Sequence, residues 1–221
     1  QKQAEDLVDF MLGDLGDKLD QMQRLDIMQS VDDKAMAYFQ SLPATDVNDV
    51  ALAQRAKAME KIGAVRMALG NLPGALEAFE VSAKLASALA AAMPADVARQ
   101  VAYSRTLAYV GMVHWNQTKL PEAQHDFEAA KGVLQSSLSQ APHNPPLLEQ
   151  LVFLDNDIGH VLEARGNAEA AQGIFKERLD LANRLVEAAP ANRNDATAAG
   201  DAHNDLGRLA LQRGDLATAI A

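Results

Sequence analysis

The sequence predicts an all-α fold of stacked helix pairs, and three observations support this prediction. A glycine recurs every 48 residues, at Gly63, Gly111, Gly159 and Gly207. Each glycine is followed by a turn residue seven positions later and an alanine twelve later, and the first three are also followed by a phenylalanine sixteen later and a proline thirty-one later. Alanine, the best helix former, is abundant, whereas aromatic residues make up 5% of the chain. Self-similarity at a period of about 20–50 residues is typical of stacked-repeat proteins.

Each 48-residue unit is expected to contain two helices. Pro73 and Pro121 fall at the start of second helices, where a proline is tolerated because its missing N–H has no helical partner. Gly70 and Gly166 fall where a helix can end in the left-handed conformation. The predicted first helices span residues 47–69, 96–117, 146–165 and 194–213. The predicted second helices span residues 72–92, 120–140 and 168–189.

The recurring glycines lie in the middle of the predicted first helices. Glycine at such a position costs about 1 kcal/mol relative to alanine. Four of them at one position therefore indicate that another helix approaches closely there. We expect this to be the second helix of the unit, with Ala75 or Ala123 at the closest approach. Phenylalanines are expected to fill the layer beside it, namely Phe79, Phe127 and Phe175.

Residues 1–45 do not follow the repeat. They are predicted to form an atypical helix pair, residues 3–20 and 24–41, that caps the array. The first 50 residues hold eleven acidic and four basic residues. We interpret this charge as a solvated face rather than a docking patch for a basic partner. The repeat array is expected over residues 46–221, in units of 46–93, 94–141, 142–189 and a truncated 190–221.

The pattern of the repeat resembles that of the tetratricopeptide-repeat (TPR) family. In that family a Leu-Gly pair precedes a small turn residue, then an alanine and an aromatic residue on the second helix, then a proline. The resemblance implies a right-handed α-solenoid, a TPR-like superhelix of antiparallel helix pairs that binds proteins. The residues that carry the resemblance are Ile62-Gly63, Gly70, Ala75, Phe79, Pro94, Val110-Gly111, Ala123, Phe127, Ala130, Pro142, Ile158-Gly159, Gly166, Ala171, Phe175, Pro190, Leu206-Gly207, Gly214 and Ala219.

The sequence also departs from the usual TPR pattern. The usual repeat has about 34 residues, so each helix is expected to be about two turns longer here. The segment before the repeats resembles a block that precedes long-period repeats in large bacterial proteins, beside a kinase, cyclase or nucleoside-triphosphatase domain. The chain is therefore expected to be a fragment of a bacterial multidomain protein, located in the cytoplasm. The aromatic residue that usually follows the Leu-Gly pair is replaced by Arg66, His114, Leu162 and Ala210.

Composition and motifs argue against several classes of function. The net charge is −10 and no basic stripe is present, which argues against nucleic-acid binding. No apolar run approaches the about 20 residues needed to cross a bilayer. Asp157, His160 and Glu163 share a helix face, but a metal centre in a helix bundle needs matching ligands from facing helices, and no second motif is present. We therefore expect no enzymatic activity, no metal and no cofactor.

The TPR resemblance implies that the first helices line a concave groove. Trp115 falls on this surface, and tryptophan and arginine are frequent interface anchors, although Trp115 could instead pack against the adjacent repeat. Glu60 and Ala64 stand where some family members use Lys and Asn to hold a terminal carboxylate, so that binding mode is not expected. The predicted groove residues are Lys57, Met67, Arg105, Met112, Trp115, Asn116, Phe153, Asn156, His160, Asn204 and Arg208.

Two hypotheses for the function follow. The first is a non-catalytic scaffold that binds a peptide or partner helix in the groove. The second is a self-association or regulatory arm that controls an enzymatic module elsewhere in the parent chain. A homo-oligomer would then form through the truncated C-terminal end. There the helix begun by Leu216, Ala219 and Ile220 stops short and is expected to expose the apolar flank of residues 195–213.

Overall fold

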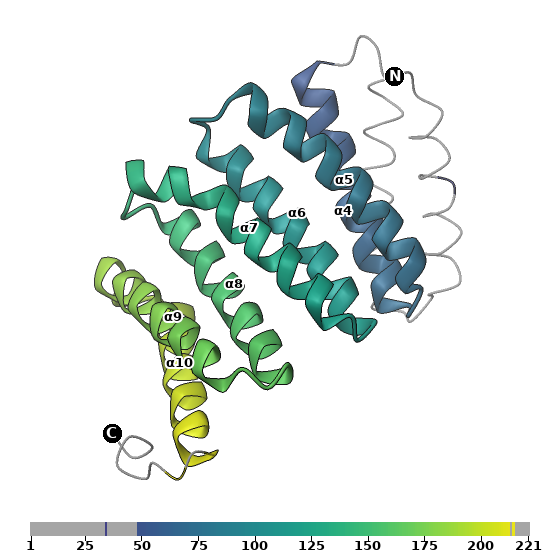
Figure 1. Ribbon diagram of the computed structural model, residues 1–221. Helices are drawn as coiled ribbons and strands as arrows, with labels where there is room; N and C mark the ends of the chain where they lie inside the picture. The colour runs from purple at the N-terminus through teal and green to yellow at the C-terminus, as the bar shows by residue number, and fades with distance from the viewer. Residues whose placement is uncertain (1–33, 35–47, 213, 215–221) are drawn as a thin grey trace. The chain divides into compact units, whose positions relative to one another are not determined.

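The computed structural model describes residue 34, residues 48–212 and residue 214 (Figure 1). Within this range the chain forms seven α-helices and no strand. It divides into two compact units, residues 1–94 and residues 95–221. The predicted cap at residues 1–45 falls outside the described residues except for Lys34. The predicted contact residues of the last unit, Leu216, Ala219 and Ile220, also fall outside them.

The first unit contains one described helix pair, α4 (Asp49–Ala68) and α5 (Leu72–Ala92), packed against each other. The second unit contains α6 (Val97–Asn116), α7 (Leu120–Gln140), α8 (Pro145–Ala164), α9 (Ala168–Ala188) and α10 (Arg193–Gln212). Helix α8 packs against α6, α7 and α9, and α10 packs against α9 (Figure 1). Every predicted helix boundary within residues 47–213 lies within two residues of the observed one. The all-α prediction is confirmed.

Short polar side chains begin the first helices. The side chain of Asn48 accepts a hydrogen bond from the amide of Ala51, and Asp96 accepts one from Arg99 at 3.2 Å. The side chain of Asn192 accepts a hydrogen bond at 3.1 Å from the amide of Asn194, two residues later in the chain. Each bond satisfies an amide that has no partner within the helix. The first helices therefore start at equal intervals along the chain, at Asp49, Val97, Pro145 and Arg193.

The turns between paired helices use a left-handed residue. Gly166 has a φ of +79°, and the amide of Asn167 donates to the carbonyl of Leu162 across it at 2.9 Å. In the second pair the same place is taken by Thr118, with a φ of +59°. A side chain that branches at Cβ is strained in this conformation, whereas glycine is not.

We expect Thr118→Gly to raise the free energy of unfolding by about 1 kcal/mol, because glycine relieves the strain of a left-handed β-branched residue. Urea unfolding followed by circular dichroism would measure the change. The reverse substitution, Gly166→Thr, should lower stability by about the same amount. A Thr118→Gly variant that is less stable than the wild type would show that the side chain makes a compensating contact.

The mid-helix glycines make the expected close approach, but the phenylalanines lie nearest to them. A Cβ atom on Gly63 would lie 2.6 Å from the ring of Phe79, and one on Gly111 would lie 2.8 Å from the ring of Phe127. The second helix therefore makes the expected close approach, but through its phenylalanine ring rather than at Ala75 or Ala123. The rings of Phe79, Phe127 and Phe175 are almost fully buried. Gly63, Gly111 and Gly159 each leave room for the ring of the second helix in the same pair.

We expect Gly111→Ala to lower the free energy of unfolding by about 1–2 kcal/mol. The clash with the Phe127 ring outweighs the gain of about 1 kcal/mol from helix propensity. Gly132→Ala in α7 is the matched control, because no atom lies within 4 Å of a Cβ at that position. This control should raise stability by up to about 1 kcal/mol. Urea unfolding of both variants would test the opposite signs.

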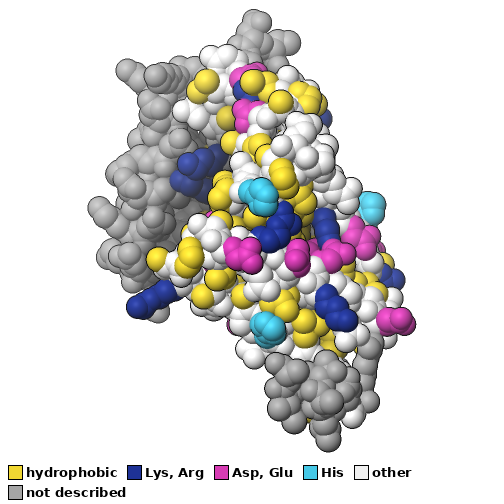
Figure 2. Space-filling model, turned by 90° about the vertical axis from the view of Figure 1, so that its left-hand side faces the viewer, with side chains coloured by type: hydrophobic (Ala, Val, Ile, Leu, Met, Phe, Trp, Pro, Cys, Tyr) yellow, Lys and Arg dark blue, Asp and Glu magenta, His cyan; other side chains and the backbone are white. Residues whose placement is uncertain are grey.

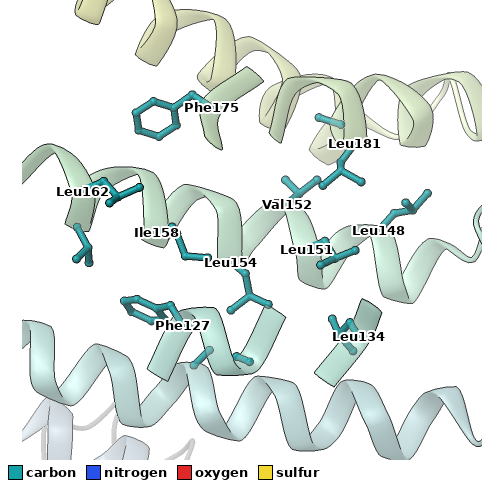
Figure 3. Packing of buried hydrophobic residues seen from close by; sticks show 14 of the residues in the cluster. Phe127, Leu134, Leu148, Leu151, Val152, Leu154, Ile158, Leu162, Phe175 and Leu181 are labelled. Carbon is teal, nitrogen blue, oxygen red and sulfur yellow. The ribbon is translucent and has the colours of Figure 1, made fainter. Parts of the chain in front are cut away.

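Helix α8 forms the middle layer of the second unit. In Figure 3 its side chains lie between Phe127 and Leu134 of α7 on one side and Phe175 and Leu181 of α9 on the other. Because α8 has neighbours on several faces, it buries more residues than the amphipathic helices beside it. Its buried apolar residues are Leu147, Leu148, Leu151, Val152, Leu154, Ile158, Val161 and Leu162.

Candidate functional site

Large apolar side chains are exposed on the first helices of the second unit. Trp115 on α6 is 37% exposed, Phe153 on α8 is 68% exposed and Leu211 on α10 is 57% exposed. Met112, one turn before Trp115 on the same helix face, is also exposed. Three of these four residues are among the predicted groove residues.

Three predicted groove residues meet at one cavity of about 210 Å³, which we call the tryptophan cavity. Met112 and Trp115 come from α6, and His160 comes from α8. Phe127 of α7 and Asp157 of α8 complete the lining. The cavity therefore combines an indole ring, a flexible thioether, an imidazole and a carboxylate.

Neighbouring side chains position the two polar residues that line the tryptophan cavity, Asp157 and His160. The ring of His160 packs edge-on against Phe175, with their centroids 5.3 Å apart. The side-chain amide of Asn156 donates to Asp157 at 3.1 Å. Burial raises the pKa of Asp157, although the bond from Asn156 opposes the shift. Of the predicted groove residues, Asn156 therefore acts on the cavity through Asp157.

Arg208 of α10 joins three helices through an ionic cluster. Its guanidinium hydrogen-bonds both carboxylate oxygens of Glu163 on α8, and it donates to Asp205 at 3.0 Å. Asp205 also accepts from Arg178 of α9 at 2.8 Å. The hydrogen bond to Arg208 lowers the pKa of Glu163. Arg208 thus stabilises the packing of α8 against α10.

His160 and Glu163, which the sequence suggested as possible metal ligands, lie beside Asp205 of this ionic cluster. His160 Nδ1 lies 3.6 Å from Glu163, and its Nε2 lies 3.9 Å from Asp205. Among the described residues, no group of three or more His, Asp or Glu side chains is arranged to hold a metal ion. On the face shown in Figure 2, acidic and basic side chains lie next to one another.

The remaining predicted groove residues do not line the tryptophan cavity. Asn116 and Asn204 are exposed, and Asn116 donates to the carbonyl of Met112 at 2.9 Å. Arg105 is half-buried on α6. Lys57 and Met67 belong to α4 of the first unit, where Lys57 is exposed and Met67 is half-buried.

Phe153 and Asp201 line a second cavity, of about 400 Å³, between α8, α9 and α10. Phe153 is a predicted groove residue, but it does not share a cavity with Trp115. The expected single cluster is therefore divided into two separate sites. The reason is the length of the first helices, since Phe153 lies almost two turns before His160 on α8.

Sequence reasoning missed an ionic triad beside the site, in which Asp155 is buried and Glu177 is exposed. Lys131 Nζ of α7 lies 2.7 Å from Asp155 of α8 and 2.6 Å from Glu177 of α9. Asp155 is fully buried, and its Oδ2 has no hydrogen-bond partner among the described residues. Burial raises the pKa of Asp155 to about 6, although Lys131 opposes the shift.

The repeat contained a signal for this triad. The position four residues before the recurring glycine is Met59 in one unit and Leu107 in the next, and both are apolar. In the third unit the same position is Asp155, and in the fourth it is His203. A charge at a position that is apolar in the two preceding units indicates an oppositely charged partner on a neighbouring helix.

None of the described helices is both apolar enough and long enough to cross a membrane. No protein-family model matches the chain. No curated protein matches it either.

Solved structures resemble the chain over most of its length. BtubC (BKLC) from P. vanneervenii superposes with a TM-score of 0.70 at 14% identity, covering 94% of this chain and 74% of that one. A structure of nearly identical TPR-like repeats, named as those of a kinesin light chain from Podosopora anserina, superposes with a TM-score of 0.63 at 13% identity. It covers 94% of this chain and 88% of that one. The chain has a TPR-like helical-repeat fold. The apo form of RapI shares it at a TM-score of 0.54 and 11% identity, over 91% of this chain and 75% of that one.

Proposed function

We propose that this TPR-like chain is a non-catalytic scaffold that binds a peptide or a partner helix along its first helices. The observation that carries the proposal is the tryptophan cavity, where Met112, Trp115 and His160 converge. The proposal includes membership of a long-repeat variant of the TPR family. The equal 48-residue spacing of the helix starts supports that part.

The size of the tryptophan cavity favours one side chain of a partner as its occupant. At about 210 Å³ it is smaller than the about 300–1,000 Å³ of pockets that enclose drug-sized ligands or cofactors. Trp115 offers a rigid apolar surface with an N–H donor, and Met112 can adjust to the shape of the occupant. The carboxylate of Asp157 and the imidazole of His160 can orient a polar end of that occupant.

Polar residues along the same helices would then position the partner backbone. Asn116 and Asn204 are exposed and carry amide groups that both donate and accept hydrogen bonds. Arg105 extends the proposed contact along α6 within the second unit. The roles of Lys57 and Met67, on α4 of the first unit, stay predictions. Arg208 contributes by holding Glu163 and α10 in place, as its hydrogen bonds indicate.

We expect Trp115→Ala to weaken peptide binding by at least about tenfold, because a central tryptophan is among the strongest interface anchors. The probe is a set of linear peptides selected from a random displayed library against the wild-type chain. Fluorescence polarisation would measure the Kd of each selected peptide for both proteins.

Methionine variants supply the matched control. Met112→Ala removes a lining residue of the tryptophan cavity and should weaken binding, whereas Met93→Ala removes a similarly exposed methionine outside it and should not. If folded Trp115→Ala and Met112→Ala proteins bind the peptides as tightly as the wild type, the cavity is not the binding site. Failure to select any peptide would argue against a peptide-binding scaffold.

A further inference from the structure

The second cavity, which we call the acidic cavity, lies between α8, α9 and α10 and has a volume of about 400 Å³. Three carboxylate side chains line it: Glu149 of α8, and Asp195 and Asp201 of α10. Phe153 lies one turn after Glu149 on the same face of α8. The only cation among its lining residues is Arg178.

The three carboxylates lack partners in the described part of the chain. No described cation lies within ion-pairing distance of Glu149, Asp195 or Asp201, although the nearby basic residues form several other pairs. Asp195 is 6% exposed and still has no hydrogen-bond donor among the described residues. Its place in the first turn of α10 offsets part of that cost through the helix dipole. Glu149 and Asp201 do not lie in the first turn of a helix, so the helix dipole does not stabilise their charges in this way.

The positive charge of Arg178 offsets only part of the negative charge of the cavity. Its Nη1 donates to Asp205 at 2.8 Å, and its side chain is 7% exposed. Asp205 does not line the acidic cavity. One guanidinium therefore faces three lining carboxylates, and the cavity presents net negative charge to an occupant.

The rim of the acidic cavity offers an aromatic face. Phe153 is 68% exposed, which is the largest exposed fraction among the described large apolar residues. A cation held over a phenylalanine ring is attracted by the ring quadrupole, and guanidinium groups use this contact more often than ammonium groups. Phe153 and the three carboxylates thus both favour the binding of a cation, and of a guanidinium group in particular.

We propose that the acidic cavity binds an arginine side chain of a partner polypeptide. The guanidinium donates to Glu149, Asp195 and Asp201 while it stacks on Phe153. This inference rests on the proposed scaffold function and adds the chemistry of the partner.

The arrangement of the carboxylates favours guanidinium over a point charge. No group of three or more acidic or histidine side chains among the described residues converges as a metal site does. The three carboxylates instead line a cavity of about 400 Å³ from two helices, Glu149 from α8 and the two aspartates from α10. A guanidinium carries five N–H donors in a plane and can reach several separated acceptors at once. An ammonium group is more compact and more strongly hydrated.

The test is a titration of the ¹⁵N-labelled chain with N-acetyl-arginine amide, followed by amide chemical shifts. Saturable shifts are expected at Phe153, Asp195 and Asp201 and not around Trp115. N-acetyl-citrulline amide, a neutral isostere, should give no such shifts, and N-acetyl-lysine amide should bind more weakly. Matched sodium chloride corrects for ionic strength. No saturable shifts, or an equal response to citrulline or lysine, would overturn the proposal.

Charge-neutral variants locate the contact. Glu149→Gln combined with Asp201→Asn should raise the Kd for N-acetyl-arginine amide at least about fivefold. Both residues are exposed, so the fold should be kept. Glu187→Gln removes an exposed carboxylate of α9 that does not line the cavity, and it should leave the Kd unchanged. Equal effects of the double variant and the control would assign the response to net charge.

This outcome is separable from that of the proposed function. Selected peptides that depend on Trp115, in a chain with no arginine response, would keep the scaffold proposal and overturn this inference. An arginine response in a chain whose peptide binding ignores Trp115 would overturn the tryptophan cavity as the anchor site and keep the acidic cavity.

Discussion

Lys131→Met is expected to lower the free energy of unfolding by about 1–2 kcal/mol at neutral pH. The substitution keeps the apolar stem of the side chain but removes the cation that lies 2.7 Å from Asp155. Asp155 is fully buried and its pKa is already raised to about 6, so without Lys131 it takes up a proton at pH 7, and this uptake limits the cost. Urea unfolding followed by circular dichroism measures the change.

A double variant separates the ion pair from the loss of packing. Lys131→Met combined with Asp155→Leu replaces both charges by apolar groups and should recover most of the lost stability. Lys176→Met is the matched control, because Lys176 is an exposed lysine of α9, and it should change stability little. If the double variant is as unstable as Lys131→Met alone, the loss does not come from an uncompensated charge.

Stability should rise when the pH falls from 7 to 5. Burial raises the pKa of Asp155 to about 6, whereas an aspartate in an unfolded chain has a pKa of about 3.9. The folded state therefore binds the proton more tightly, and protonation favours folding between these two values. The expected gain is about 1–2 kcal/mol at pH 5, with a limit of about 3 kcal/mol at lower pH.

The Asp155→Asn variant isolates this contribution. Asp157 also has a raised pKa and shifts stability in the same direction, whereas Glu163 has a lowered pKa and loses its contribution as the pH falls below its ordinary range. Both groups remain in the variant, so the difference between wild type and variant reports Asp155 alone. Chemical unfolding at pH 7, 6 and 5 would measure it. A difference that stays constant across this range would contradict the assigned pKa.

The helices and their boundaries could be predicted because the signals for them are local. Asp96 caps its helix through an amide three residues away, and Gly166 turns the chain within a few residues. Such contacts depend on residue type and spacing, which the repeated columns display directly. The mid-helix glycines likewise predicted a close approach. The side chain involved could not be predicted, because the contact of the Phe127 ring with Gly111 depends on how the two helices pack.

The candidate site was predicted in part. Exposure of Trp115 and Phe153 followed from their positions on the first helices, and His160 joins Trp115 at one cavity. The division into two cavities could not be read from the sequence, since it depends on how α9 and α10 pack against α8. Arg208 was expected to face a ligand, but its guanidinium holds Glu163 and Asp205.

The sequence by itself determined that this protein is all-α, where each helix begins and ends, and which helix faces carry apolar residues. These properties arise from interactions between residues a few positions apart. The tertiary structure decided which charges are compensated. Lys131 and Asp155 are distant in sequence and meet only because α7 packs on α8. Glu149 and Asp201 line one cavity, but no described cation lies within ion-pairing distance of either. Electrostatic balance depends on distances between elements, and only the packed chain sets those distances.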